Sequence, residues 1–210
     1  LIAFYLPQYH PIPENDKWWG AGFTEWGNVG KAKKLFKSHD QPKIPADLGY
    51  YDLRVPETRE KQAELAKNAG IEAFCYWHYY FGNGKRLLEY PLEQMLKTKS
   101  PDFPFCLAWA NHSWYDKTWK TNYDNKRERK LLIEQLYLGK EDFDLHFKTL
   151  LEAFKDPRYY KIQGKLVFVF NEVLEIKNIN QLMERWQELS VEYSLPGFYF
   201  IAHSYKSAEI

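Results

Sequence analysis

Five short apolar runs, separated by stretches with helical periodicity, constrain the fold of this 210-residue chain more than any other feature. Near-continuous apolar runs of this length are typical of strands that are buried on both faces of a parallel sheet. Strand and helix patterns that alternate along a chain predict repeated βα units. The five runs cover residues 1–6, 71–77, 104–109, 165–170 and 198–203.

Four stretches between these runs have the features of helices. Pro56 begins a predicted helix that Gly70 ends, because proline suits the first helical turn and glycine suits the position after the last one. A second helix is predicted over residues 84–97. Apolar residues that recur every three or four positions predict two more, over residues 141–154 and 182–193.

This succession of elements favours the α/β class and a (β/α)8 barrel of the TIM type, in a single domain over residues 1–210. A complete barrel has eight strands and about 250 residues. We therefore expect about five of the eight βα units here, with the barrel truncated on its C-terminal side. A doubly wound open sheet of five strands is the alternative, and the lack of a G-x-G-x-x-G motif after the first strand weakens its dinucleotide-binding version.

Charge and composition narrow the classes of partner. The chain has 29 Lys and Arg against 28 Asp and Glu, which argues against a nucleic-acid partner. Its longest clean apolar run, residues 166–170, is too short to span a membrane.

Cys75 and Cys106 lie in apolar runs, so we expect buried free thiols. Without zinc-type ligand spacing, neither a metal nor a cofactor is expected. The first residues do not resemble a signal peptide, which leaves the compartment open.

Aromatic residues make up 18% of the chain, including 8 Trp and 16 Tyr. Tyr and Trp combine a flat apolar face with a polar edge, and sugars are apolar on one face and polar at the rim. The composition therefore fits a carbohydrate ligand, and it fits an aromatic-rich core equally well.

Polar side chains follow every predicted strand. The active site of a parallel barrel lies at the C-terminal ends of its strands, so side chains at these ends converge on one face. Each histidine taken singly could be a loop or core residue, but the convergence favours a site. These residues are Tyr9 and His10, His78 and Tyr79, Asn111 and His112, Asn171 and Glu172, and His203 and Ser204.

Two connections are unusually long. The first, residues 7–55, is predicted to fold over the barrel mouth, because long loops in compact domains are usually lids or binding loops. Aromatic residues alternate there, and after the third strand, with amide, imidazole and carboxylate groups, as in carbohydrate clefts. Aromatic packing of the loops on the barrel is the alternative. The aromatic and acidic residues concerned are Trp18, Trp19, Glu25 and Trp26 in the first connection and Trp109, Trp114, Tyr115, Asp116 and Trp119 in the second.

Glycosidic-bond chemistry requires a pair of carboxyl groups, one of them held protonated by its surroundings. Glu172 is the first candidate, because the apolar strand before it could raise the pKa of its carboxyl group, and Asn171 could bind a sugar hydroxyl. Glu25 is the second. Glu172 could instead be a solvated loop residue or a helix N-terminal charge. The Asp142-Phe143-Asp144 sequence matches the D-x-D pattern of many glycosyltransferases, but acidic residues also favour the start of a helix.

Several long motifs occur in a recognisable order: FYLPQYHPIPENDKWWGAGFTEWGNV, QPKIPADLGYYDLRVPE, KQAELAKNAGIEAFCYWHYYFGNGKRLLEYPL and FPFCLAWANHSW. Together they resemble the WbsX-type family, whose members are usually described as glycosyltransferases or lipopolysaccharide-biosynthesis proteins. That family is similar to the endo-α-mannosidases of glycoside hydrolase family 99. The resemblance implies a bacterial (β/α)8 barrel, in the cytoplasm or periplasm, that needs no metal. It would hydrolyse or transfer α-mannosidic or similar linkages in a polysaccharide or O-antigen-like glycan.

The sequence departs from the family pattern in two places. The family's principal catalytic carboxylates lie in an Asn-Glu-Trp-type segment late in the barrel, and no such segment follows Glu172. Where members commonly have Asn-Glu, this chain has Asn111-His112, so His112 could bind a hydroxyl or act as a base. The catalytic candidates are therefore Glu172, His112 and His10, and the other residues named above are candidates for substrate binding. A sugar-nucleotide-dependent glycosyltransferase and a non-catalytic glycan-binding module are the alternatives.

Overall fold

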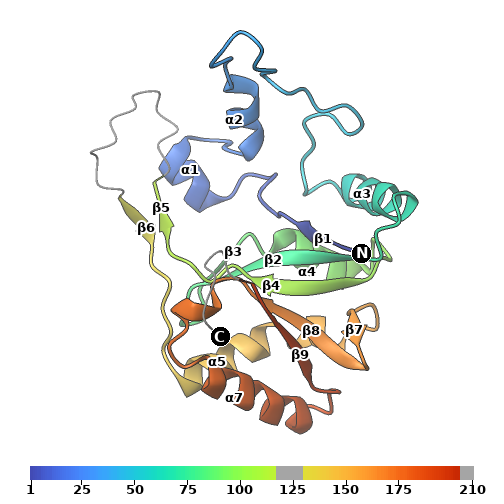
Figure 1. The fold of residues 1–210 in the computed structure, drawn as a ribbon, viewed down its shortest axis with the longest axis vertical. Coiled ribbons are helices and arrows are strands. Elements are labelled where there is room, and N and C mark those ends of the chain that lie inside the picture. The colour runs from blue at the N-terminus through green and yellow to red at the C-terminus, as the bar shows by residue number, and fades with distance from the viewer. Residues whose placement is uncertain (117–129, 204–210) are drawn as a thin grey trace.

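The computed structural model describes residues 1–116 and 130–203. Its centre is a mainly parallel sheet with helices packed against it (Figure 1). Two short strands pair with this sheet in the antiparallel direction, and two others form a small separate sheet. The parallel strands are β1 (Ile2–Tyr5), β2 (Ala73–Tyr80), β4 (Phe105–Trp109), β8 (Lys165–Phe170) and β9 (Phe198–Ala202); the antiparallel ones are β3 (Arg86–Leu87) and β7 (Lys161–Ile162); the separate pair is β5 (Trp114–Tyr115) and β6 (Leu131–Ile133).

The five parallel strands lie side by side in their order along the chain, β1-β2-β4-β8-β9. A doubly wound sheet reverses its strand order at a switch point, and no reversal occurs here. This order is that of a TIM-type barrel, and it excludes the doubly wound alternative. All five predicted strands are confirmed, although β2 continues to Tyr80, beyond its predicted end. Within the described residues β1 and β9 do not pair with each other, so the sheet is open.

The helices lie between the strands and within the first long connection (Figure 1). The predicted helix after Pro56 is confirmed, and Gly70 follows it with a φ of 77°, which glycine adopts without strain. In the two described ranges, no helix is long and apolar enough to cross a bilayer. The helices are α1 (Pro13–Trp19), α2 (Glu25–Lys31), α3 (Pro56–Asn68), α4 (Tyr90–Thr98), α5 (Lys140–Thr149), α6 (Leu151–Lys155) and α7 (Ile179–Glu192), with a short 3-10 helix η1 (Val173–Glu175).

The helix predicted over residues 84–97 begins later than expected. Its first residues form a turn and the short strand β3, and α4 starts only at Tyr90. Two local features explain the shift. Leu88 has a φ of 61°, outside the helical region, and Pro91 fits only the first turn of a helix because it has no N–H group to donate.

The helix predicted over residues 141–154 is broken at Leu150 into α5 and α6. The Thr149 hydroxyl donates a hydrogen bond of 2.7 Å to the carbonyl of His146, within the last turn of α5. This side chain competes with the main chain for a helical acceptor. The Leu150 N–H accordingly bonds to Phe147, three residues back, and the helix ends.

The largest apolar cluster packs helices α3, α4, α5 and α7 against the sheet. Trp186 of α7 is fully buried, with its ring 4.8 Å from that of Phe168 and 5.6 Å from that of Phe198. Its indole N–H donates to the carbonyl of Phe143, so the buried polar atom is satisfied. Cys75 and Cys106 are register partners on β2 and β4, and both are buried free thiols as predicted.

Candidate functional site

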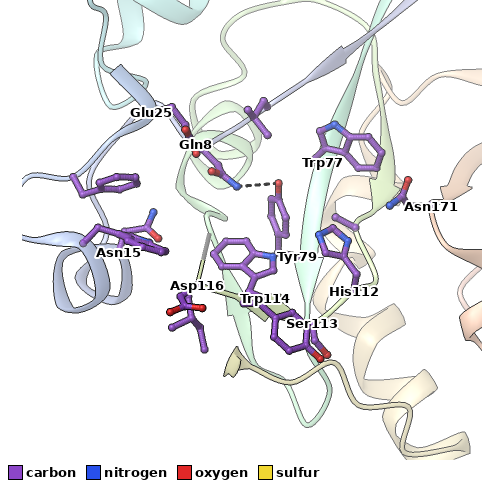
Figure 2. Close-up of a pocket in the computed structure, with 16 residues that line it drawn as sticks. Gln8, Asn15, Glu25, Trp77, Tyr79, His112, Ser113, Trp114, Asp116 and Asn171 are labelled. Carbon is purple, nitrogen blue, oxygen red and sulfur yellow. Dashed lines mark hydrogen bonds between the residues drawn. The ribbon is translucent and has the colours of Figure 1, made fainter. Parts of the chain in front are cut away.

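A cleft of about 580 Å³ lies at the C-terminal ends of the parallel strands (Figure 2). Its walls come from the first long connection, from the end of β2 and from the segment that follows β4. Five residues proposed from the sequence line it: Trp19, Glu25, His112, Trp114 and Asn171. The other lining residues are Leu6, Gln8, Asn15, Phe23, Trp77, Tyr79, Ala110, Ser113, Tyr115, Asp116 and Leu132.

Two tryptophans form fixed aromatic surfaces in the cleft. Trp114 is held by edge-to-face contacts with Tyr79 at 5.2 Å and with Trp18 at 6.0 Å between ring centroids. Trp77 stacks on Phe4 of β1 at 4.6 Å with an interplanar angle of 5°. Trp18 therefore supports the wall of the cleft without lining it. Aromatic surfaces held in this way lose little conformational freedom when they bind a ligand.

Polar groups face these aromatic surfaces. Glu25 and Asn15 lie on one side of the cleft, and His112 lies on the other (Figure 2). Asn15 is only 3% exposed, so the part of its side chain that is accessible lies in the cleft lining. Burial raises the pKa of Tyr79 to about 12, so its hydroxyl, which accepts a bond from the Gln8 amide at 3.3 Å, stays neutral at physiological pH. The cleft thus offers carboxylate, amide, imidazole and hydroxyl groups.

Tyr9 and Trp26 hold the first connection together instead of lining the cleft. Their rings lie 4.6 Å apart, and both pack on Tyr51. The Trp26 indole N–H donates to the Tyr51 carbonyl at 2.8 Å. His10 is also away from the cleft lining: it is buried beside Tyr90, and burial lowers the pKa of its imidazole.

The expectation that His78 and Trp109 face the cleft needs correction. Because β2 runs on to Tyr80, His78 lies inside the strand, and alternation turns its side chain toward the helices. Its Nε2 lies 2.9 Å from Nε2 of His146, and burial lowers the pKa of His78 to about 3 and that of His146 well below its usual range. Trp109 packs on His146 and donates its indole N–H to the Tyr80 carbonyl. Both histidines are neutral core residues.

Glu172 and Asn111 are likewise not part of the cleft lining. Asn111 is buried at the end of β4, and its amide bonds to both main-chain groups of Glu172, at the end of β8. The neighbouring Asn171 does line the cleft. The Oδ1 atom of Asn171 lies 2.8 Å from Nδ1 of His203, so the two side chains are in contact. Asn171 is therefore held in position by the bonds of Asn111 to the neighbouring Glu172 and by its own contact with His203.

Sequence reasoning missed Trp77, noted Tyr79 only as a polar residue beside His78 without assigning it to the cleft, and missed Gln8 and Asn15. Trp77 and Tyr79 share the face of β2 opposite to His78, so an accurate strand end and the period-two rule would have identified them. Gln8 and Asn15 carried no sequence signal. Trp119 and Ser204 lie outside the described residues. In the ranges that the structure covers, no group of three or more His, Cys, Asp and Glu side chains is placed to hold a metal ion.

The D-x-D carboxylates at the start of α5 have protein partners. Asp142 is buried and accepts hydrogen bonds from the Tyr80 hydroxyl at 2.5 Å and from the Asn83 N–H at 2.7 Å. Asp144 makes two bonds, of 2.6 and 2.7 Å, to the guanidinium of Arg185 on α7. These contacts give both acidic residues a structural role.

A parallel sheet in barrel order, with a cleft at the C-terminal ends of its strands, defines an α/β protein of the TIM-barrel class. The chain belongs to the family described as Glycosyltransferase WbsX, whose model matches residues 1–209. It is 43% identical over 189 residues to the uncharacterized protein WxcX of Xanthomonas campestris pv. campestris, in two strains. The match covers 89% of this chain and 26% of WxcX, so the chain spans about a quarter of that relative's length.

Two solved structures of the GH99 endo-α-mannosidase from Bacteroides thetaiotaomicron have the same fold. The first has a TM-score of 0.54 and 15% identity, and covers 100% of this chain and 56% of the mannosidase. The second, a complex with bis-tris propane, has a TM-score of 0.50 and 16% identity over 99% and 53% of the two chains. The family resemblance and the TIM-type fold inferred from the sequence are therefore confirmed.

Proposed function

We propose that the protein cleaves or transfers glycosidic linkages in a polysaccharide or O-antigen-like glycan, and that hydrolysis is its main reaction. One observation carries this proposal: aromatic surfaces and carboxylates share one cleft at the C-terminal ends of the strands. Trp77 and Trp114 supply flat surfaces for the apolar faces of sugar rings. Glu25, Asp116 and His112 supply groups that bind hydroxyls or carry protons.

Glu25 and Asp116 replace Glu172 as the carboxylates assigned to this cleft. A glycosidic bond breaks through a transition state with positive charge near the anomeric carbon, and a nearby carboxylate stabilises that charge. Glu25 and Asp116 line the cleft, whereas Glu172 does not. The main chain of Glu172 is hydrogen-bonded to the side chain of Asn111. The family resemblance puts the principal catalytic carboxylates in a later segment of the barrel. Glu25 and Asp116 therefore serve binding and charge stabilisation.

Product analysis of the full-length protein tests the proposal. Purified bacterial O-polysaccharides and α-mannans are incubated with the protein, and new reducing ends are measured without any added sugar donor. Reducing ends that increase with time and enzyme concentration support hydrolysis. Product that forms only with an activated sugar donor would rule hydrolysis out and leave transfer.

Transfer from an activated sugar is the second candidate, because the family description names a glycosyltransferase. The partners of Asp142 and Asp144 weigh against a metal-nucleotide site at their D-x-D sequence. A non-catalytic glycan-binding module is the third. Oligosaccharide would then quench tryptophan fluorescence in the cleft, and neither the reducing-end assay nor the donor assay would give a product.

A further inference from the structure

A strongly basic segment, residues 31–44, follows helix α2. It holds five lysines and one carboxylate, Asp40, in a chain whose charges otherwise nearly balance. Lys43 pairs with Asp40. The other four lysines form no ion pair within the described ranges of the chain, so their charges are free to meet an external anion. All five lysines are exposed: Lys31, Lys33, Lys34, Lys37 and Lys43.

Large apolar side chains are exposed in the same segment. Leu35 is 70% exposed, Phe36 is 61% exposed and Ile44 is 76% exposed. A local turn holds the first two: the Leu35 N–H donates to Nδ1 of His39 at 3.2 Å, and the His39 N–H donates to the Phe36 carbonyl at 3.0 Å. The Phe36 ring also stacks on the His39 ring at 4.8 Å. Apolar groups are therefore presented to solvent by a hydrogen-bonded turn.

The basic segment, residues 31–44, lies where a large partner can reach it. It continues from α2 at the end of the molecule remote from α5, α7 and β9 (Figure 1). Helix α2 begins at Glu25, which lines the cleft, and ends at Lys31, where the basic segment begins. A helix of this length is about 10 Å long. A partner bound to the basic segment would thus lie close to the cleft.

We propose that residues 31–44 dock the protein onto an anionic lipid surface. The lysines would contact lipid phosphates, while Leu35, Phe36 and Ile44 enter the boundary between headgroups and acyl chains. Binding to a membrane surface grows with the apolar area that is inserted and with the attraction of basic residues to anionic lipids, and both features occur here within 14 residues. An acidic polysaccharide in solution would neutralise the lysines but leave the three apolar side chains in water, so a lipid surface fits better.

Vesicle flotation of the full-length protein tests this proposal. The vesicles are phosphatidylcholine, with or without phosphatidylglycerol, and we expect binding only when phosphatidylglycerol is present. A lysine near an anionic surface contributes about 1 kcal/mol, or about fivefold in affinity. The triple variant Lys33→Gln/Lys34→Gln/Lys37→Gln should therefore bind about 100-fold more weakly. A matched control removes three exposed lysines elsewhere, as Lys161→Gln/Lys165→Gln/Lys177→Gln, and should change binding less than about twofold.

A second variant separates apolar insertion from charge. Leu35→Ser/Phe36→Ser keeps every lysine and should lower binding to the anionic vesicles, most visibly at high salt, where surface charges are screened. Unchanged thermal unfolding of each variant excludes a folding defect. Three results would overturn the proposal: no binding of the wild type, equal loss in the control triple variant, or unchanged binding of the serine variant. The last of these, combined with competition by an acidic polysaccharide, would identify a polyanion site instead.

Discussion

Asn111 holds both main-chain groups of Glu172: its Oδ1 accepts from the Glu172 N–H at 3.0 Å, and its Nδ2 donates to the Glu172 carbonyl at 3.0 Å. This pair of bonds fastens the end of β4 to the end of the neighbouring strand β8. The Asn111 amide also bonds to the hydroxyl of Tyr137. Asn171, next to Glu172, is thereby fixed at the cleft.

Replacing Asn111 should destabilise the protein. Asn111→Ala removes a buried side chain and leaves the partly buried Glu172 N–H and carbonyl without their partner, so the free energy of unfolding should fall by about 1–3 kcal/mol. Urea denaturation measures the loss. Asn111→Asp keeps the acceptor for the N–H but removes the amide donor, and should not recover wild-type stability. An alanine variant as stable as the wild type would show that this amide does not fasten the strands.

Two glutamate variants test which carboxylate acts in the cleft. Glu25→Gln removes a charge that lines the cleft, and kcat/KM for glycan cleavage should fall about 100-fold. Glu172→Gln is the matched comparison, since it makes the same change outside the cleft lining, and should keep kcat/KM within about threefold. Initial rates of reducing-end formation provide the measurement. The reverse order of effects would return the catalytic role to Glu172.

The structural role of Asp144, in the D-x-D sequence, can be tested through its partner Arg185 on α7. Asp144→Asn weakens the bond to Arg185 and should lower stability by about 1 kcal/mol while kcat stays unchanged. Arg185→Gln breaks the same contact from the other side and should cost a similar amount. Thermal unfolding and turnover are compared for both variants. Loss of activity in Asp144→Asn alone, restored by added manganese, would point to a metal-nucleotide site instead.

The buried pair His78 and His146 should make the protein sensitive to acid. Burial lowers the pKa of His78 from 6.5 to about 3 and lowers that of His146 as well, so the unfolded chain binds protons more readily than the folded one. Stability is therefore complete above about pH 6.5 and falls as the pH drops toward 3, by up to about 1.4 kcal/mol per pH unit for each imidazole. Urea denaturation between about pH 7 and about pH 5 measures this slope.

A double variant identifies the histidines as the source of that slope. His78→Phe/His146→Leu replaces both imidazoles with apolar groups that cannot be protonated, so its stability should depend less on pH over the same range. Carboxylates titrate in both the wild type and the double variant, so their contribution to the pH dependence cancels when the two slopes are compared. Equal slopes for the two proteins would mean that other groups cause the acid sensitivity.

The sequence predicted the sheet better than the cleft. Buried parallel strands need long apolar runs, and such runs are visible in any single chain, which is why all five strands were found. The cleft depends on which way each side chain points. An error of three residues at the end of β2 assigned His78 to the cleft and left Trp77 and Tyr79 out. Glu172 was misplaced because its contact with Asn111 joins residues 61 positions apart, which no local pattern records.

Strand order also bears on how the chain is made. Each parallel strand pairs with the one synthesised just before it, from β1 through β9. A nascent chain that leaves the ribosome therefore meets a partner edge already in place for every new strand. Parallel sheets otherwise fold slowly, because their pairings join distant residues. Sequential addition keeps the unpaired apolar edge limited to one strand at a time, which shortens the exposure that leads to aggregation during synthesis.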